Sequence, residues 1–404
     1  MHFHQVTQQL KSAPIADITA EVHKQLDSLT IDVPRGDVAI TVGSRGICNL
    51  AEIIRATGEW LRDHGASPFV IPSMGSHNGA TAEGQQAMVE SLGITESAMG
   101  MPIRSSMECV EVGKVATGTV WMDRHAYESA GTLVVNRVKL HTCFSGPVQS
   151  GLVKMMVVGM GKIESATTFH SAPTDEMKDM LLEMGKFLLD SNKVWAGLAI
   201  LEDGFDQTAE LHALPAADIL KTEPSLLEKH REYFPALPLD DLNVLIVDEI
   251  GKTYSGTGMD TNVIGYRGVK GYEDLAKPEI KIIAALSLYA GSQGNALGVG
   301  LSDFITQRLR AEIDERKTFI NAFTTGDMAR AKIPATLDDD KEIFETIASR
   351  YGTERWMVIP NTLHLGNLFV SPDLADEVAA NPICTVAKSP TELQFDNGRH
   401  QLFA

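Results

Sequence analysis

The chain has 404 residues, of which 44% are hydrophobic and 22% are charged. This length and composition are typical of a globular protein with two or three domains, and they exclude a peptide hormone or a disulfide-rich miniprotein. The formal net charge of −18 repels nucleic-acid phosphates and anionic membranes, so neither is expected as a partner.

The cysteines and the N-terminal segment predict a cytoplasmic protein. Cys48, Cys109, Cys143 and Cys384 are widely spaced and form no CxxC pair, which is typical of reduced thiols. The segment MHFHQVTQQLKS lacks the basic and apolar regions of a signal peptide. The long uncharged run 282–302 is interrupted by GSQGN and is interpreted as a buried strand, a turn and a helix start, not a membrane span.

Short β-branched runs alternate with helical patterns in the first half of the chain. This alternation predicts βαβ units and a mainly parallel sheet. The expected elements are a strand over Asp37–Gly43, a helix over Asn49–His64, a strand over Phe69–Pro72, a helix over Ala82–Leu92, a strand over Leu133–Val138 and an apolar segment over Pro147–Met160.

Two prolines and a polar cluster in Glu232–Asp241 predict a domain boundary, with domains over residues 1–237 and 238–404. The second domain is expected to have strands at Asn243–Asp248, Ile280–Leu288 and Trp356–Pro360 and a helix at Asp303–Arg316. The predicted fold class is therefore α/β, with two α/β domains, mainly parallel sheets and an active-site cleft between the domains.

Polar residues follow three predicted strands of the first domain, where ligands bind in open α/β sheets. They are Ser44-Arg45-Gly46, Ser76-His77-Asn78 and His141-Thr142. Arg45 is either a solvated loop cation or a ligand for a carboxylate or phosphate. His77 and His141 each suit a structural role alone, but together they could exchange protons on opposite faces of a substrate.

Two lysines lie in the apolar stretch GLVKMMVVGMGK. Desolvation is expected to lower the pKa of Lys154 toward that of a nucleophilic amine, unless the side chain reaches the surface along its apolar stem. Lys162 is expected to be solvated. It does not belong to a phosphate-binding P-loop, because Met156 stands where that motif has glycine and Ile163 where it has Ser or Thr.

Three further features are weaker signals. His170 lies sixteen residues beyond Lys154 without a metal-binding spacing, so by itself it suits a core or loop histidine. GSQGNALG, from Gly291, lacks the GxGxxG form of a dinucleotide-binding turn. The glycine-rich segment Asp248–Asn262, with Lys252, Tyr254, Ser255 and Asp260, is predicted to form the second wall of the interdomain cleft.

The order of these residues resembles the nickel-dependent lactate racemase family, which uses a nickel-pincer nucleotide. The resemblance spans most of the chain and rests on SRG near position 45, MGSHNGAT near 77, NRVKLHT near 141, SGLVKMMVVGMGK near 154 and the downstream His170. It implies a first domain that tethers the cofactor and a second that closes the cleft. It also implies that proteins of cofactor biosynthesis are partners; homo-oligomerisation is left open.

The resemblance implies a role for each matching residue. Lys154 would hold the cofactor covalently, with Ser44 among the cofactor-binding residues, and His170 would ligate nickel. His77 and His141 would be the acid–base pair, Arg45 would bind the substrate carboxylate, and Lys252 would also contact the substrate.

The implied reaction is racemisation or epimerisation of a 2-hydroxy acid, either lactate-like or a sugar acid. Hydride would pass to the cofactor while a histidine takes the hydroxyl proton, and a flat 2-keto acid would receive hydride back on its other face. The chain departs from the lactate enzyme at Val42, Gly43 and Ser44 and in a longer spacing around CFSGPVQSG. Both departures indicate a different substrate.

Two other functions fit the residues less fully. An NAD-dependent oxidoreductase of a small hydroxy acid would bind NAD reversibly and carry no adduct on Lys154. A non-catalytic carboxylate-binding protein would keep its ligand affinity after His77→Ala and His141→Ala and would show no turnover.

Overall fold

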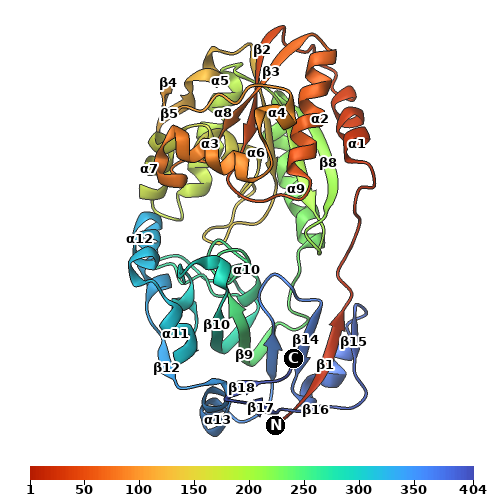
Figure 1. Ribbon diagram of the computed structural model, residues 1–404, viewed down its shortest axis with the longest axis vertical. Coiled ribbons are helices and arrows are strands. Elements are labelled where there is room, and N and C mark those ends of the chain that lie inside the picture. Colours follow the sequence, from red (N-terminus) through yellow and green to blue (C-terminus); the bar gives the residue numbers. More distant parts are fainter. The chain divides into compact units, whose positions relative to one another are not determined.

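The computed structural model describes residues 1–404 and divides into two compact units. One unit is Lys11–Phe234, and the other combines Met1–Leu10 with Pro235–Ala404. The first ten residues were expected in the N-terminal domain, and this assignment is wrong. They form strand β1 (His2–Gln8), which pairs with β14 (Asn367–Val370) and β15 (Cys384–Val386) and buries Phe3 and Val6 (Figure 1).

The unit Lys11–Phe234 contains the predicted mainly parallel sheet, with the strand order β3-β2-β6-β7-β8. The first four strands are mutually parallel, whereas β8 is antiparallel to β7. Their bounds are β2 Gly36–Val42, β3 Ala66–Pro72, β6 Gly131–Arg137, β7 Val194–Glu202 and β8 Thr208–Pro215. The carboxyl ends of the parallel strands therefore share one edge of the sheet, as expected from the sequence.

Helices cover the sheet on two sides. Helices α1 (Ile18–Asp27) and α2 (Leu50–Asp63) bury apolar residues in a core shared with alternate residues of β2, β6 and β7. Gly197 of β7 lets α6 (Leu152–Lys154) and α9 (Ile219–Tyr233) approach closely, because a Cβ there would lie 2.6 Å from Leu152 Cδ1. The other elements are α3 Ala82–Ser91, α4 Glu96–Met99, β4 Cys109–Val115, β5 Gly118–Asp123, α5 Arg124–Glu128, η2 Met155–Gly159, α7 Lys162–Ser171 and α8 Met177–Asp190.

The second unit is built on a larger sheet with the order β12-β11-β10-β9-β13-β14-β1-β15, in which β16 (Thr391–Glu392) also pairs with β1. The strands from β12 to β13 are parallel, and β14, β1 and β15 extend the sheet in antiparallel fashion. The parallel strands are β9 Asp241–Ile250, β10 Glu279–Leu288, β11 Phe304–Thr306, β12 Ala335–Leu337 and β13 Trp356–Ile359. The helices are α10 Thr261–Ile264, α11 Gln307–Glu312, α12 Glu315–Thr325, α13 Asp340–Tyr351 and α14 Ala375–Ala379.

The helix predicted over Asp303–Arg316 is only partly correct. Residues Phe304–Thr306 form β11, which pairs with β10, and the helix begins after Thr306, whose hydroxyl accepts a hydrogen bond from Leu309 N at 3.0 Å. The uncharged run 282–302 continues from β10 into short 3-10 turns rather than into a helix start. No helix of the structure has the length and apolar character needed to cross a membrane.

Candidate active site

The loops after β2 and β3 meet through Ser44 and His77. The two strands are paired to their last residues, Val42 opposite Pro72, so the loops leave the sheet side by side. A hydrogen bond of 2.5 Å joins Ser44 Oγ to His77 Nδ1. The structure thus brings together two residues that lie far apart in the chain, as the parallel-sheet interpretation expects.

The loop after β6 orients His141. Its backbone N–H donates to Gln149 Oε1 at 2.7 Å, and its ring Nδ1 accepts a hydrogen bond from Cys143 N at 3.1 Å. An acceptor at Nδ1 means that Nε2 carries the proton of the neutral ring. The ring also packs against Phe144, with 4.3 Å between centroids.

Lys154 and His170 lie on one interrupted helical segment. Lys154 ends α6, the π-helix η2 follows with Met160 N donating to Met155 O at 2.9 Å, and α7 carries His170 near its end. Such π-helical turns occur frequently at functional sites. Lys154 Nζ lies 5.8 Å from the ring centroid of Phe169, the neighbour of His170.

Two phenylalanine rings connect these residues with His141. Phe144, which packs on His141, lies 6.2 Å from Phe169 in an edge-on arrangement, and Phe169 contacts both Lys154 and His170. Both phenylalanines are fully buried or nearly so. The loop after β6 and the Lys154 helix therefore share one apolar contact.

Lys154, His170 and Arg45, here called the cluster, lie in surroundings that disfavour positive charge. The pKa of Lys154 is lowered to about 8, mainly by burial; Cys143 acts in the opposite direction, and Arg45 adds to the lowering. Burial and then Lys154 lower the pKa of His170 to about 4, so this imidazole is neutral at pH 7. The lowered pKa of Lys154 agrees with the expectation from its apolar neighbours.

Arg45 belongs to the same field of positive charge. Part of its side chain is exposed, but the protein atoms around the rest remove enough water to lower its pKa, and Arg137 lowers it further. No carboxylate forms an ion pair with Arg45, Lys154 or His170. The cluster is thus a set of cationic and neutral nitrogen groups without an internal anion.

Two residues that the sequence interpretation missed, Glu202 and Arg137, form an ion pair that anchors the loop carrying Arg45. Glu202, at the end of β7, forms an ion pair with Arg137 and accepts a hydrogen bond from Cys48 N at 2.7 Å. This carboxylate neutralises Arg137 and ties the loop after β2 to the neighbouring strands. The available signal was its position, because Glu202 ends a strand at the same edge of the sheet.

A third missed residue, Glu223 of α9, supports the start of α6. Its side chain is 1% exposed, and its Oε2 accepts a hydrogen bond from Val153 N at 2.9 Å. A Cβ at Gly151 would overlap Glu223 Oε1, so glycine leaves room for this carboxyl group. Burial raises the pKa of Glu223 to about 7. No local pattern identifies it, because a glutamate in an amphipathic helix normally indicates an exposed position.

The expectation that Lys162 is solvated is wrong. Its side chain is 0% exposed and forms an ion pair of 3.1 Å with Asp123, which is also 0% exposed. The backbone at Lys162 has φ +50°, which turns the side chain inward to groups supplied by other elements. The sequence interpretation placed Lys162 in solvent because its buried partner, Asp123, lies far away in the sequence.

Lys252 belongs to the other unit, where it holds the loop after β9. Its ammonium donates to Gly256 O at 2.6 Å and to Asn321 Oδ1 at 2.7 Å. These contacts fasten the loop to helix α12. Its assignment to substrate binding stays a prediction.

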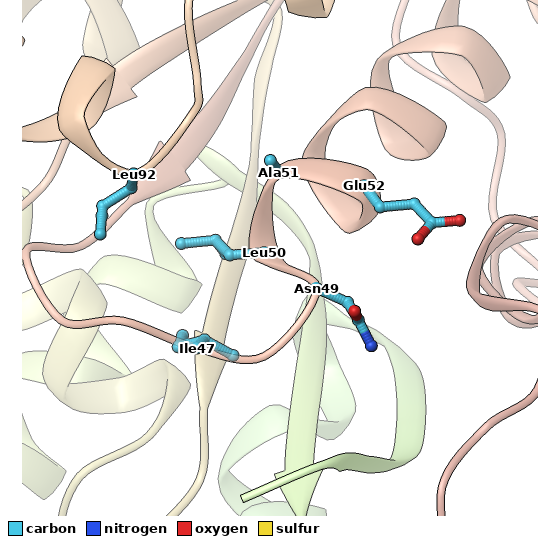
Figure 2. A pocket seen from close by; sticks show the side chains of 6 residues that line it. All are labelled: Ile47, Asn49, Leu50, Ala51, Glu52 and Leu92. Atoms are coloured by element: carbon cyan, nitrogen blue, oxygen red, sulfur yellow. The ribbon is translucent and has the colours of Figure 1, made fainter.

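A cavity of about 330 Å³ lies beside the loop that carries Arg45. Figure 2 shows Leu50 directed toward the side where Leu92 lies, while Glu52 points away from it. The lining residues are Ile47, Asn49, Leu50, Ala51, Glu52 and Leu92. None of the candidate residues lines this cavity, so the cavity and the candidate site are separate.

A solved structure with a similar fold is the lactate racemase apoprotein from Thermoanaerobacterium thermosaccharolyticum. The two chains are 14% identical, the match covers 90% of this chain and 99% of that one, and the TM-score is 0.55. The two proteins therefore share an α/β fold over nearly their whole lengths. No protein-family model matches the chain, and no curated protein matches its sequence.

Proposed function

We propose that this protein is an isomerase that racemises or epimerises 2-hydroxy acids with a nickel-pincer nucleotide held covalently by Lys154. The observation that carries the proposal is the joining of Lys154, His170 and Arg45 in one electrostatic cluster without a carboxylate partner. The fold shared with a lactate racemase supports it.

The residues fit the proposed cofactor. Lys154 is half-buried, and its pKa of about 8 makes a neutral, nucleophilic amine accessible. His170 offers a neutral imidazole, the form that binds a metal. No group of three or more His, Cys, Asp and Glu side chains could hold a metal, so the remaining donors would come from the cofactor, whose soft sulfur atoms suit nickel.

In the proposed reaction, Arg45 binds the substrate carboxylate and orients the hydroxyl-bearing carbon. Arginine suits this task because its planar guanidinium can form two parallel hydrogen bonds with a carboxylate. Because no carboxylate of the protein forms an ion pair with Arg45, the substrate carboxylate would be its partner. Arg137 and Glu202 keep the loop in place during turnover.

His77 and His141 move the hydroxyl proton in this proposal. One ring takes the proton as the carbon becomes planar, and the other returns a proton on the opposite face. Nε2 of His141 carries a proton in the neutral ring, which suits the donating role. When bound, the cofactor would supply a hydride acceptor and donor for the hydroxyl-bearing carbon.

The test is intact mass together with nickel content, on protein co-produced with a complete pincer-synthesis pathway. Wild type is compared with Lys154→Ala and with Lys186→Ala, a control that removes an exposed lysine of α8. We expect a covalent mass increase and nickel in wild type and in the control, with neither in Lys154→Ala.

A screen of 2-hydroxy acids for racemisation or epimerisation follows on the loaded protein. The pathway is verified in the same cells by loading a lactate racemase. If that enzyme is loaded and this chain carries neither adduct nor nickel, the proposed function is wrong, and reversible NAD binding becomes the next measurement.

A further inference from the structure

Three buried polar side chains form a network beneath the candidate site. Lys162 of α7, Gln85 of α3 and Asp123 of β5 are all 0% exposed. The Lys162 ammonium donates to Pro72 O, lies 3.4 Å from Gln85 Oε1 and forms the ion pair with Asp123. The network thus connects the start of α7 with the end of β3.

The amide of Gln85 extends the network into the loop that carries His77. Its Nε2 donates to Gly75 O at 2.8 Å and to His77 O at 3.4 Å, while its Oε1 faces Lys162. Carbonyl oxygens only accept hydrogen bonds, so this orientation of the amide is determined by its partners. One side chain therefore links the His77 loop to the lysine at the start of α7.

A second contact runs beside the first. Gly75 N donates to Gly159 O of the π-helix at 3.2 Å. The backbone at Gly75 has φ +61°, and a Cβ there would lie 3.3 Å from Ala166 of α7. The His77 loop is thus packed against the same helical segment that carries Lys154 and His170.

Stability alone does not account for a buried lysine and aspartate. Removing two charges from water is costly, and apolar residues of similar volume often give equal or greater stability. Lys162 also occupies the left-handed region, which is unfavourable for a residue with a Cβ. The network instead fixes the position of the His77 loop relative to helix α7, which carries His170.

We infer that Lys162 and Gln85 are positioning residues that hold His77 in a set orientation relative to Lys154 and His170. The importance of that orientation for turnover rests on the proposed function. The positioning itself concerns only residues of this chain. It predicts that loss of the Gln85 amide disorders the His77 ring in a protein that is still folded.

The experiment measures the imidazole of His77 by NMR in protein labelled with ¹⁵N-histidine, without cofactor or substrate. The His77 signals are assigned with His77→Gln. In wild type, the contact between Ser44 Oγ and Nδ1 predicts the ring-nitrogen shifts of a single tautomer. In Gln85→Glu, the new carboxylate keeps the contact with Lys162 but cannot donate to Gly75 O and His77 O, so we expect shifts averaged between two tautomers.

Gln86→Glu is the matched control, because Gln86 neighbours Gln85 on α3 but its amide donates to Glu90 on the same helix. It should retain the wild-type His77 signals. Gln85→Met provides a second, uncharged removal of the amide and should give the same averaging as Gln85→Glu. Unchanged His77 signals in a folded Gln85 variant contradict the inference. If neither Gln85 variant folds, the network serves folding alone and the inference is equally overturned.

The loaded enzyme separates this inference from the proposed function. Gln85→Glu should retain the adduct and nickel while lowering kcat at least tenfold, and Gln86→Glu should match wild type. A loaded Gln85→Glu variant with unchanged kcat contradicts the positioning role. A wild type without adduct contradicts the proposed function and leaves the NMR result to stand by itself.

Discussion

The two units surround their candidate cationic and imidazole groups differently. In the unit Lys11–Phe234, Arg45 lowers the pKa of Lys154 and Lys154 lowers that of His170, and none of the three forms an ion pair with a carboxylate. In the other unit, Lys252 is bound by a carbonyl and an amide of its surroundings, and His400 contacts Asp248 at 2.9 Å.

Under the proposed function, this difference separates residues that hold the fold from residues that bind a ligand. A cation that is bound within the protein holds a loop in place and contributes to stability. Cations and imidazoles that are desolvated without an internal anion are stabilised by an anionic ligand, which is typical of functional sites. In the unit that contains Lys154, the buried carboxyl groups of Asp123, Glu202 and Glu223 instead contact Lys162, Arg137 and the backbone of Val153.

The largest expected effect comes from the buried supports. Lys162→Met leaves Asp123 unpaired and buried and should lower the free energy of unfolding by about 3–5 kcal/mol. The double variant Lys162→Met/Asp123→Asn should recover most of this loss, because the neutral amide still caps α5 through Oδ1. Lys252→Met should cost about 2 kcal/mol or less. Denaturant unfolding measures all three, and equal losses at Lys162 and Lys252 would remove the contrast between the units.

A somewhat smaller effect should depend on pH through Glu223. Its pKa is about 7 in the folded protein, against an ordinary value of 4.5, so the folded chain binds more protons than the unfolded chain between these values. Stability therefore falls as the pH rises from 4.5 to 7, by about 3 kcal/mol. Glu223→Gln should remove this fall and should be more stable than wild type above pH 7.

The control for Glu223 is Glu228→Gln, which changes an exposed residue of the same helix. Its pH profile of stability should follow that of wild type. A profile of Glu223→Gln that also follows wild type would show that Glu223 is charged at no cost, and the Lys154 helix would then lack this buried support.

The smallest expected effect is stabilisation by a carboxylate ligand. Pyruvate or lactate at ten times its Kd should add about 1.4 kcal/mol to the free energy of unfolding, which raises the Tm by a few degrees. Arg45→Gln should abolish the shift. Lys252→Gln should retain more of it, because the Lys252 ammonium already has two acceptors. If Arg45→Gln and Lys252→Gln lose the stabilisation equally, Lys252 also contacts the ligand.

Local patterns were sufficient for much of the fold. The strands β2 and β6 and the helices α2 and α3 were predicted within two residues of their observed bounds, because each segment contains its own periodicity of buried residues. The predicted strand at β3 began three residues late. The contact between the Ser44 and His77 loops also followed from sequence, since parallel strands end at one edge.

The failures share one cause. The pairing of β1 with β14 and β15, the short strand β11 and the burial of Lys162 all depend on partners far away in the chain. Gln85 and Glu223 gave no local signal either, because polar residues on helices are usually exposed.

The sequence by itself determined the α/β class, the parallel edge that collects Arg45, His77 and His141, and the apolar surroundings that lower the pKa of Lys154. Only the tertiary structure decided which polar side chains are buried as supports and which cations lack a partner. Burial and charge pairing are properties of groups brought together from distant segments, and their free energies exist only once the chain has folded.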